Sequence, residues 1–400
     1  MISDILAGVT VVEFAEGIAG PFGGQILADL GARVIKVEPL DGDWGRALET
    51  PAGQAPVFMG CNRGKESLSL DLRKPAGPEI VRRLAARADV FLQAYRPSVA
   101  ESMGLGPEDL LASNGRLVYC ALSGFGDRGP KREKPGSDTI LQAYSGLMSS
   151  TGEADRLPAR VGTAIGDTAS GVYAALGILA LLLRREQTGT GGRCDTSLLE
   201  ALISLQTTTY SDFFAGIVPR RLGSRSSLSA VPAEAIPTRD GVLSVSCHAP
   251  RQWHKLCVAI GRPDLEDDPR FALNRDRVEN HDLLVDELQS TLETRTTTQW
   301  MAIFDEQGVN AGPINTVEQV THDEHVAALG LFRPFTSERW GEFTLVDTPI
   351  TIDGEVDHPA PLDPPLCGEH TIALLDELGY SAAEIGALVE AGVVVERVTA

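Results

Sequence analysis

A single carboxylate, Asp167, stands near the start of a long apolar run, GTAIGDTASGVYAALGILALLLRR, between residues 162 and 185. An Asp in front of an apolar helix suits an N-cap, because its carboxylate accepts hydrogen bonds from the free amides of the first turn. The position also suits a nucleophile or base, since a carboxylate at the positive end of a buried helix stays ionised. The residue chemistry alone favours the N-cap and leaves a catalytic carboxylate as the alternative.

Glycines surround this carboxylate. Gly162 and Gly166 precede it and Gly171 follows it, and each would allow a backbone or a ligand to approach closely. The strongly apolar stretch from Gly171 to Leu183 is shorter than the roughly 20 residues that span hydrocarbon. We therefore expect a central buried helix rather than a membrane helix.

A second motif, Gly124-Phe-Gly126-Asp-Arg-Gly129, has the spacing of a dinucleotide fingerprint. Pro130 and Pro135 interrupt the helix that such a fingerprint must open, so we expect a glycine-rich turn and no nicotinamide binding. The densest basic cluster in the first half of the chain follows the motif. It suits a phosphate group or a solvated loop, and its members are Lys131, Arg132 and Lys134.

Histidine and cysteine provide little that is typical of a metal site or a catalytic triad. All seven histidines lie at or beyond His248, and His322 and His325 resemble a metal pair only in their spacing, so a solvated helix face is expected. The absence of GxSxG disfavours a Ser-His-Asp hydrolase. Six scattered cysteines without CxxC suit reduced, mostly buried thiols.

Length and charge restrict the classes of partner. A chain of 400 residues favours two domains over one. The 55 acidic residues exceed the 35 basic ones, and the formal charge of -20 disfavours nucleic acid and anionic membranes as partners. The N-terminal MISDILAGVTVVEF has no basic n-region and no apolar h-region. We therefore expect no signal peptide, and a cytoplasmic protein that binds small molecules.

The elements that must position these residues alternate between strand and helix. Helical spacing at 20–32 and 78–88 separates strand-like segments at 9–14, 33–38, 67–72, 89–95 and 116–123. This alternation predicts an α/β fold with a Rossmann-like parallel sheet. The Ser-, Pro- and Gly-rich stretch 223–238 indicates a boundary. We expect a large domain, 1–224 with 331–400, and a small α+β domain, 225–330, with a hairpin around 239–241.

Several motifs together resemble the class III CoA-transferase family, which includes formyl-CoA and carnitine CoA-transferases and the related α-methylacyl-CoA racemases. The resemblance covers nearly the whole chain. It is carried by IAGPFGGQILADLGARVIKVE (18–38), NRGKESLSLDL (62–72), ADVFLQAYRP (88–97), RLVYCALSGFGDRGP (116–130), GD (166–167), TGTGGRCDTSLLEA (188–201), DPRF (268–271) and NAGPINT (310–316).

The resemblance implies a Rossmann-like large domain built from both chain ends, a small inserted domain and an interlocked homodimer. It implies a CoA-transferase that moves CoA from an acyl-CoA to a carboxylic acid, with Asp167 as the nucleophile that forms an aspartyl anhydride and then an aspartyl-CoA thioester. No metal or redox cofactor and no tightly bound cofactor is implied, since coenzyme A enters as a substrate.

The resemblance also implies CoA contacts after four strands. Arg73, Arg96 and Lys134 are the expected phosphate partners, and Tyr95 is expected to flank adenine or pantetheine. The full predicted set is Ile18, Ala19, Leu70, Asp71, Leu72, Arg73, Ala94, Tyr95, Arg96 and Lys134.

Three departures from the family pattern bear on CoA binding, on the substrate and on the type of reaction. The usual ENFRPG motif reads QAYRPS from Gln93 to Ser98, with Ala94 in place of Asn, and Ser102 replaces a basic residue, so CoA is expected to be held differently in detail. The glycine-rich loop of formyl-CoA transferases has no counterpart around 245–262, which disfavours oxalate or formate specificity.

The third departure separates transferase from racemase. Racemases of the family carry His in a GHD motif that here reads Gly136-Ser137-Asp138, and Ser137 cannot hold the second proton that racemisation needs. A racemase or other acyl-CoA isomerase would need a histidine of the small domain, such as His248 or His254. A non-catalytic acyl-CoA-binding protein is the remaining alternative.

Overall fold

The computed structural model describes residues 4–226, 230–354 and 362–395. The chain forms two compact units: a sheet unit of Met1–Leu147, Val161–Thr207 and Ala327–Ala400, and a second unit of Met148–Arg160 and Thr208–Val326. Both chain ends belong to the sheet unit. The second unit starts before residue 225 and takes in residues 148–160, so these units do not share the boundaries predicted at 225 and 330.

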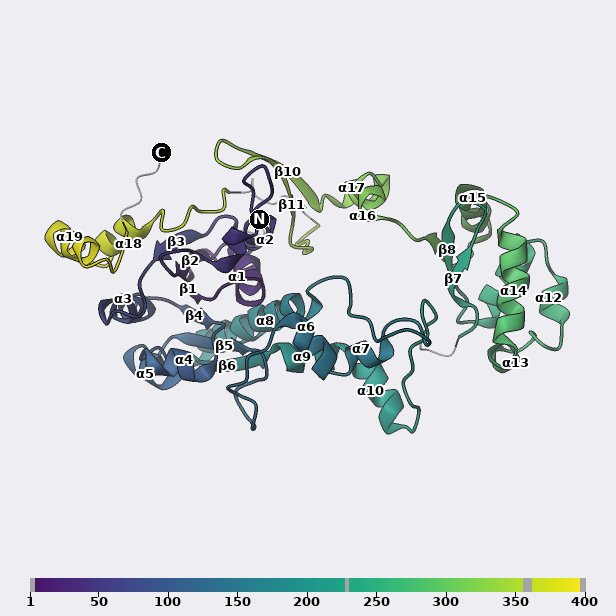
Figure 1. The fold of residues 1–400 in the computed structure, drawn as a ribbon, viewed down its shortest axis with the longest axis horizontal. Helices are drawn as coiled ribbons and strands as arrows, with labels where there is room; N and C mark the ends of the chain where they lie inside the picture. The colour runs from purple at the N-terminus through teal and green to yellow at the C-terminus, as the bar shows by residue number, and fades with distance from the viewer. Residues whose placement is uncertain (1–3, 227–229, 355–361, 396–400) are drawn as a thin grey trace. The chain divides into compact units, whose positions relative to one another are not determined.

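The sheet unit contains six parallel strands in the order β3-β2-β1-β4-β5-β6 (Figure 1). The strands are β1 (Thr10–Phe14), β2 (Arg33–Glu38), β3 (Glu66–Ser69), β4 (Val90–Gln93), β5 (Val118–Ser123) and β6 (Gly192–Ser197). The order reverses between β1 and β4, and ligands of such sheets bind at the carboxyl ends beside this switch point. The predicted parallel sheet of an α/β fold is confirmed.

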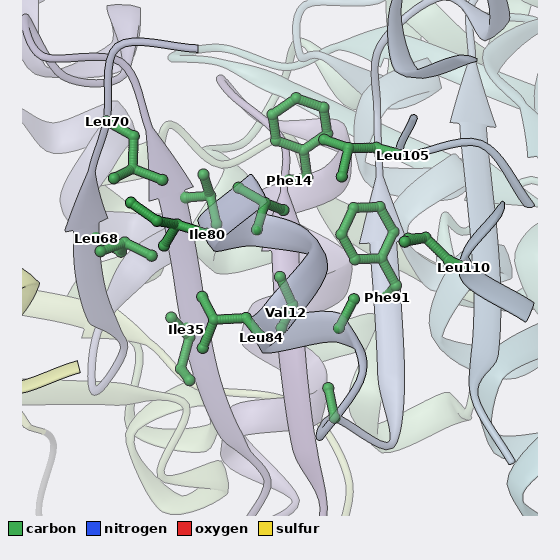
Figure 2. Packing of buried hydrophobic residues seen from close by; sticks show 14 of the residues in the cluster. Val12, Phe14, Ile35, Leu68, Leu70, Ile80, Leu84, Phe91, Leu105 and Leu110 are labelled. Carbon is green, nitrogen blue, oxygen red and sulfur yellow. The ribbon is translucent and has the colours of Figure 1, made fainter. Parts of the chain in front are cut away.

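Helices cover both faces of this sheet because its strands are apolar on both sides. One face packs on α1 (Ala19–Asp29), α8 (Ile165–Thr188) and α9 (Leu198–Leu205) through residues such as Val11 and Val34. The opposite face, which carries Val12, Ile35 and Phe91, packs on α3 (Ala76–Ala85), α5 (Pro107–Ser113) and α18 (Thr371–Glu377). Figure 2 shows this second core, in which Ile80 and Leu84 of α3 lie over the strands.

The remaining helices of the described residues are short or belong to the second unit. They are the 3-10 helix η2 (Trp44–Ala47) and α2 (Pro56–Asn62), α4 (Pro97–Ser102), α6 (Asp138–Tyr144), α7 (Leu147–Ser150), α10 (Thr207–Phe214), α11 (Pro250–Ala259), α12 (Asp264–Asp267), α13 (Asn274–Glu279), α14 (His281–Leu292), α15 (Thr297–Gln307), α16 (Val317–Thr321), α17 (Glu324–Leu329) and α19 (Ala382–Glu390).

Helix α8 crosses α1 at two glycines. A Cβ on Gly171 would stand 2.7 Å from the Ala19 carbonyl oxygen and 3.0 Å from the Gly23 nitrogen. A Cβ on Gly23 would in turn stand 3.0 Å from the Gly171 carbonyl oxygen. The two backbones therefore approach too closely for any side chain, which explains glycine at both positions.

Helix α8 is longer and less buried than its sequence suggests. Its 24 residues are long and apolar enough to cross a membrane, the one such helix in the described parts of the chain, and 39% of its apolar window is buried. Val172, Leu176 and Leu183 are 49%, 59% and 66% exposed, so the prediction of a buried helix is wrong for this face. Its other faces pack on α1, α9, β5 and β6, as a core helix does.

The second unit is an α+β structure built on an antiparallel sheet. Its strands are β7 (Ala233–Pro237), β8 (Val242–Ser246) and β9 (Ala311–Pro313), paired in the order β7-β8-β9. The hairpin predicted around 239–241 is confirmed, since the Thr238 amide donates to the Gly241 carbonyl at 2.9 Å. Trp253, Trp300 and Phe304 form the centre of the core between this sheet and its helices.

The C-terminal segment returns to the sheet unit and is fastened there by polar contacts. It carries the hairpin β10 (Phe332–Ser337) and β11 (Gly341–Val346) before α18 and α19. Thr348 donates to the Asp29 carboxylate of α1 at 2.5 Å, and Arg63 pairs with the same carboxylate. The His370 amide donates to the Ser67 carbonyl of β3 at 3.0 Å, so both ends of the chain build one sheet unit.

Candidate active site

The parallel sheet places the predicted CoA residues on one edge. Their four segments follow the carboxyl ends of β1, β3, β4 and β5, which lie at the same edge because all the strands run in parallel. The segments after β1 and β4 are neighbours at the switch point. The Ala94 amide donates to the Phe14 carbonyl at 3.1 Å, and a Cβ on Gly20 would stand 3.1 Å from the Ala94 Cβ.

The segment after β3 exposes one of its four predicted residues. The Leu70 side chain is fully buried in the core, so CoA could meet only its backbone, and Leu72 is partly buried. The Asp71 carboxylate accepts from the Arg73 guanidinium at 2.9 Å, which holds the pKa of Asp71 below its usual value. The Arg73 side chain is 88% exposed and is therefore the residue of this segment best placed to meet a phosphate.

The Tyr95 side chain contacts residues of β1 and of the turn that follows it. Its hydroxyl donates to Glu16 at 2.5 Å, and its ring centroid lies 4.4 Å from that of Phe14. Burial, followed by the Glu16 carboxylate, raises the pKa of this phenol far above its usual value. Tyr95 therefore ties the loop after β4 to the turn after β1, and its hydroxyl is already occupied.

The basic residues near β4 and β5 differ in their surroundings: one is paired with carboxylates and the others are exposed to solvent. Arg132 lies 3.0 Å from Glu101, 3.3 Å from Glu133 and 3.6 Å from Asp127, so neighbouring carboxylates balance its charge. Arg96, Lys131 and Lys134 are exposed, and the Lys134 amine lies 5.6 Å from the centroid of the Phe125 ring. Arg96 and Lys134, two of the three predicted phosphate partners, are therefore exposed.

The GxGxxG motif forms turns, as predicted. Gly126 and Gly129 have φ values of +92° and +85°, which L side chains rarely adopt, and α6 begins only at Asp138. Because no helix opens at the motif, it lacks the amide cluster of a dinucleotide site.

Asp167 lies inside the first turn of α8 and does not cap it. The helix begins at Ile165 after Ala164, which makes no side-chain cap, so the N-cap interpretation is wrong. A different carboxylate binds this helix end: Asp138 Oδ1 accepts from the Gly166 amide at 2.7 Å, and its Oδ2 accepts from Gln142 at 2.6 Å. The Asp167 carboxylate is therefore not required for the helix end.

The surroundings of Asp167 make its carboxyl group an unusually basic one. Burial and, second, the nearby Asp138 carboxylate raise the pKa of Asp167 to about 6. Residues four apart lie on one face of a helix, so Asp167 shares a face with Gly171. Gly171 touches the first turn of α1 at Ala19, and this face of α8 therefore lies toward the turn after β1.

Comparison with known proteins identifies this arrangement. The model of CoA-transferase family III matches residues 6–371. The chain is 34% identical to mouse (Mus musculus) succinyl-CoA:glutarate CoA-transferase, covering 98% of this chain and 91% of that protein. It is 36% identical to the succinate–glutarate CoA-transferase of Agrobacterium fabrum, covering 93% of this chain and 95% of that protein.

The chain belongs to CoA-transferase family III. The resemblance stated from the motifs is confirmed. The fold agrees as well, because the crystal structure of a CAIB/BAIF family protein from Brucella suis superposes with a TM-score of 0.82 at 34% identity, covering 93% of this chain and 99% of that one.

In a member of CoA-transferase family III, the residue at position 137 helps to distinguish a transferase from a racemase. Ser137, which stands where racemases carry histidine, directly precedes Asp138, the residue that binds the start of α8. The small-domain alternatives, His248 and His254, belong to the second unit, and His254 pairs with Glu266 at 2.7 Å. No histidine of the described sheet unit before residue 327 is available as a base.

An apolar cavity of about 910 Å³ opens beside the first turn of α8. Thr163, Ala164 and Thr168, the neighbours of Asp167 in the sequence, line it, as do Ile18 just before α1 and Phe22 in α1. It continues along α8 to the C-terminal return segment. The first turn of α8 therefore borders an open apolar volume within the sheet unit.

His322 and His325, for which a solvated face was expected, are both exposed. The His322 ring donates to the Glu318 carbonyl of its own helix at 2.8 Å, and the described residues contain no group of three His, Cys, Asp or Glu side chains suited to a metal.

Sequence reasoning missed the residues that hold this site in place. Asp138 and Gln142 fix the start of α8, and Lys36 and Asp43 bind the turn after β1. One signal was present: Glu13 and Lys36 are charged residues inside otherwise apolar central strands. A buried charge needs a partner, so such a residue indicates a network.

Proposed function

We propose that this chain moves CoA from an acyl-CoA to a carboxylic acid through covalent intermediates on Asp167. Its carboxylate oxygen attacks the thioester carbon, and the C–S bond breaks to give an aspartyl-acyl anhydride and CoA thiolate. The thiolate attacks the aspartyl carbonyl, and the first acid leaves as its carboxylate. The acceptor carboxylate then repeats the sequence in reverse, so that the acyl-CoA product leaves and Asp167 is regenerated.

The observation that carries this proposal is the state of the Asp167 carboxyl group. With a pKa of about 6 it is mostly ionised at neutral pH and is more basic than an ordinary carboxylate, which favours nucleophilic attack. It lies in the first turn of α8, where the helix dipole favours negative charge. Family membership supports CoA thioesters as its substrates.

Trapping of the enzyme carboxyl tests the mechanism. The chain is incubated with an acyl-CoA and then with hydroxylamine or borohydride, and Asp167 is examined by peptide mass spectrometry. Modification of Asp167 is the expected result, and Asp167→Asn should remain unmodified and inactive. An unmodified Asp167 in a protein that turns over would overturn the covalent mechanism.

A panel of donors and acceptors identifies the substrates. Succinyl-CoA and glutarate open the panel because both appear in the name of the mouse relative, which is 34% identical. We propose dicarboxylic acids as the first substrate class, with monocarboxylic acids as the comparison. CoA transfer is read by mass spectrometry of the CoA products.

Racemisation is the second candidate, and solvent deuterium distinguishes it. A racemase exchanges the α-proton of a branched acyl-CoA with deuterated solvent, whereas a transferase does not. Ser137 in place of histidine disfavours exchange because serine does not accept a proton at neutral pH. A third possibility, an acyl-CoA-binding protein without turnover, predicts CoA binding that survives Asp167→Ala and no activity in the parent.

We also propose an interlocked homodimer of a cytoplasmic enzyme. Half-exposed apolar side chains on α8 and α9, among them Val172, Leu176 and Ile203, support a further protein surface over these helices. Sedimentation equilibrium tests the dimer, and cell fractionation tests the location. A monomer at micromolar concentration would overturn the dimer.

A further inference from the structure

The turn between β1 and α1 rests on a fully buried ion pair. The side chains of Lys36, from β2, and Asp43 are 0% exposed and lie 2.8 Å apart. The Lys36 amine donates to the Ala15 carbonyl at 2.8 Å, and the Asp43 carboxylate accepts from the Gly17 amide at 3.0 Å to each oxygen. The pair therefore binds the turn on both sides of Glu16.

The charges around this pair are balanced. Lys36 also lies 3.2 Å from Glu13, and Lys65 lies 2.7 Å from the other oxygen of Glu13. The side chains of these two lysines and two carboxylates are all fully buried. The buried Glu38 carboxylate of β2 lies beside them, since it accepts from the Asp43 amide at 2.9 Å and pairs with Arg46 at 2.8 Å. A buried ion pair is often no more stabilising than an apolar pair of equal volume. The hydrogen bonds that the pair makes to the turn therefore explain its presence better than a gain in stability does.

The Trp44 side chain also contacts the turn, at Gly17. Gly17 has φ +79°, and a Cβ there would stand 2.3 Å from the Trp44 indole. The indole thus lies directly against Gly17, while 51% of the residue remains exposed. The backbone of the turn thus contacts both the ion pair and the indole, which together restrict its movement.

We propose that Lys36 and Asp43 are positioning residues for acyl-CoA. They fix the backbone that leads into Ile18 and Ala19, the residues predicted to meet CoA beside the switch point, and they act through that backbone without touching the substrate. The inference rests on the proposed function, since it requires CoA to bind at this turn.

Binding and kinetics of Asp43→Asn test the proposal. The amide keeps an acceptor for Gly17 and removes the charge opposite Lys36. We expect CoA affinity, measured by titration calorimetry with CoA itself, to fall about tenfold and KM for acyl-CoA to rise about tenfold. We expect kcat to stay within about twofold, because Asp167 is untouched. Lys36→Met should give the same pattern with a larger loss.

Asp89→Asn is the matched control. Asp89 also joins a buried cation, Arg185, at 2.9 Å and accepts from a backbone amide, that of Thr10, at 2.9 Å, but it lies at the amino end of β4. It should lower the free energy of unfolding and leave CoA affinity and KM unchanged. Equal changes in CoA affinity for both variants would overturn the proposal, as would unchanged affinity in folded Asp43→Asn.

Two further variants cover the case in which the ion-pair variants do not fold and distinguish this proposal from the proposed mechanism. If the ion-pair variants fail to fold, Gly17→Ala decides, because it shifts the turn and leaves the pair in place: raised KM supports the proposal and unchanged KM overturns it. Asp167→Asn separates the two proposals. Lost turnover with retained CoA affinity is expected there, and retained turnover would contradict the Asp167 mechanism alone.

Discussion

Asp138 Oδ1 lies 2.7 Å from the Gly166 amide, so the start of helix α8 is bound by a carboxylate from helix α6. The next residue along the chain, Asp167, is thereby left without a capping role. The two carboxylates share one region, and Asp138 contributes to the raised pKa of Asp167. One acidic residue binds the start of the helix, and the other is the nucleophile that we propose.

Replacing Asp138 should separate these effects. Asp138→Ala removes the acceptor of the Gly166 amide and one of the two acceptors of the Gln142 side chain, and it should lower the free energy of unfolding by about 1–3 kcal/mol. Asp138→Asn keeps an acceptor and should cost less. It also removes a negative charge, so the pH profile of kcat/KM should move to lower pH. Denaturant unfolding and pH-rate profiles measure both, and an unmoved profile would contradict the electrostatic role.

Activity should depend on the ionisation of Asp167. With a pKa of about 6, kcat/KM should fall about tenfold per pH unit below pH 6 and level off above about pH 7. The measurement is kcat/KM between pH 4.5 and 8 under conditions in which the protein stays folded. A profile that is flat down to pH 5 would show that this carboxylate does not limit the reaction.

Asp167 should also reduce stability at neutral pH. Its folded-state pKa of about 6 lies above the ordinary 3.8, so the folded protein holds this proton more tightly than the unfolded chain. Stability therefore falls as pH rises from 3.8 to 6 and stays lowered above that. Asp167→Asn should raise the free energy of unfolding at pH 8 by about 1–2 kcal/mol after solvent screening, with a smaller gain at pH 4.5.

The glycine crossing of α1 and α8 should be intolerant of a methyl group. Gly171→Ala brings a Cβ to 2.7 Å from the Ala19 carbonyl and should lower the free energy of unfolding by about 1–3 kcal/mol. Gly177→Ala, in the same helix, meets only Cys194, with Sγ at 3.2 Å, and should change stability by less than about 1 kcal/mol. Equal losses in the two variants would rule out the close crossing as the cause.

Removing the exposed cations should weaken the binding of CoA phosphates. Arg96→Ala and Lys134→Ala should each raise KM for acyl-CoA about three- to tenfold, with the effect shrinking at high salt. Arg116→Ala, an exposed arginine before β5 at the amino edge of the sheet, is the control and should leave KM unchanged. If all three variants behave alike, the carboxyl edge holds no phosphate site.

The alternation of apolar strands and helices predicted much of the sheet unit. The segments 9–14, 33–38 and 116–123 correspond closely to β1, β2 and β5, because a strand buried on both faces needs a continuous apolar run. The predicted domain boundaries do not match the compact units, since residues 148–160 pack with the second unit. Packing between segments that are far apart in the sequence leaves little pattern in the residues of either segment.

The sequence by itself determined the family, the parallel sheet and the carboxylate at the start of α8, because strand periodicity and spaced motifs are local properties. Only the tertiary structure decided that this carboxylate does not cap the helix. Asp167 and Asp138 are 29 positions apart, and their roles depend on which one meets the Gly166 amide. Hydrogen bonds between distant segments depend on packing, and this packing removed Asp167 from the cap and left its carboxyl group basic at the edge of the sheet.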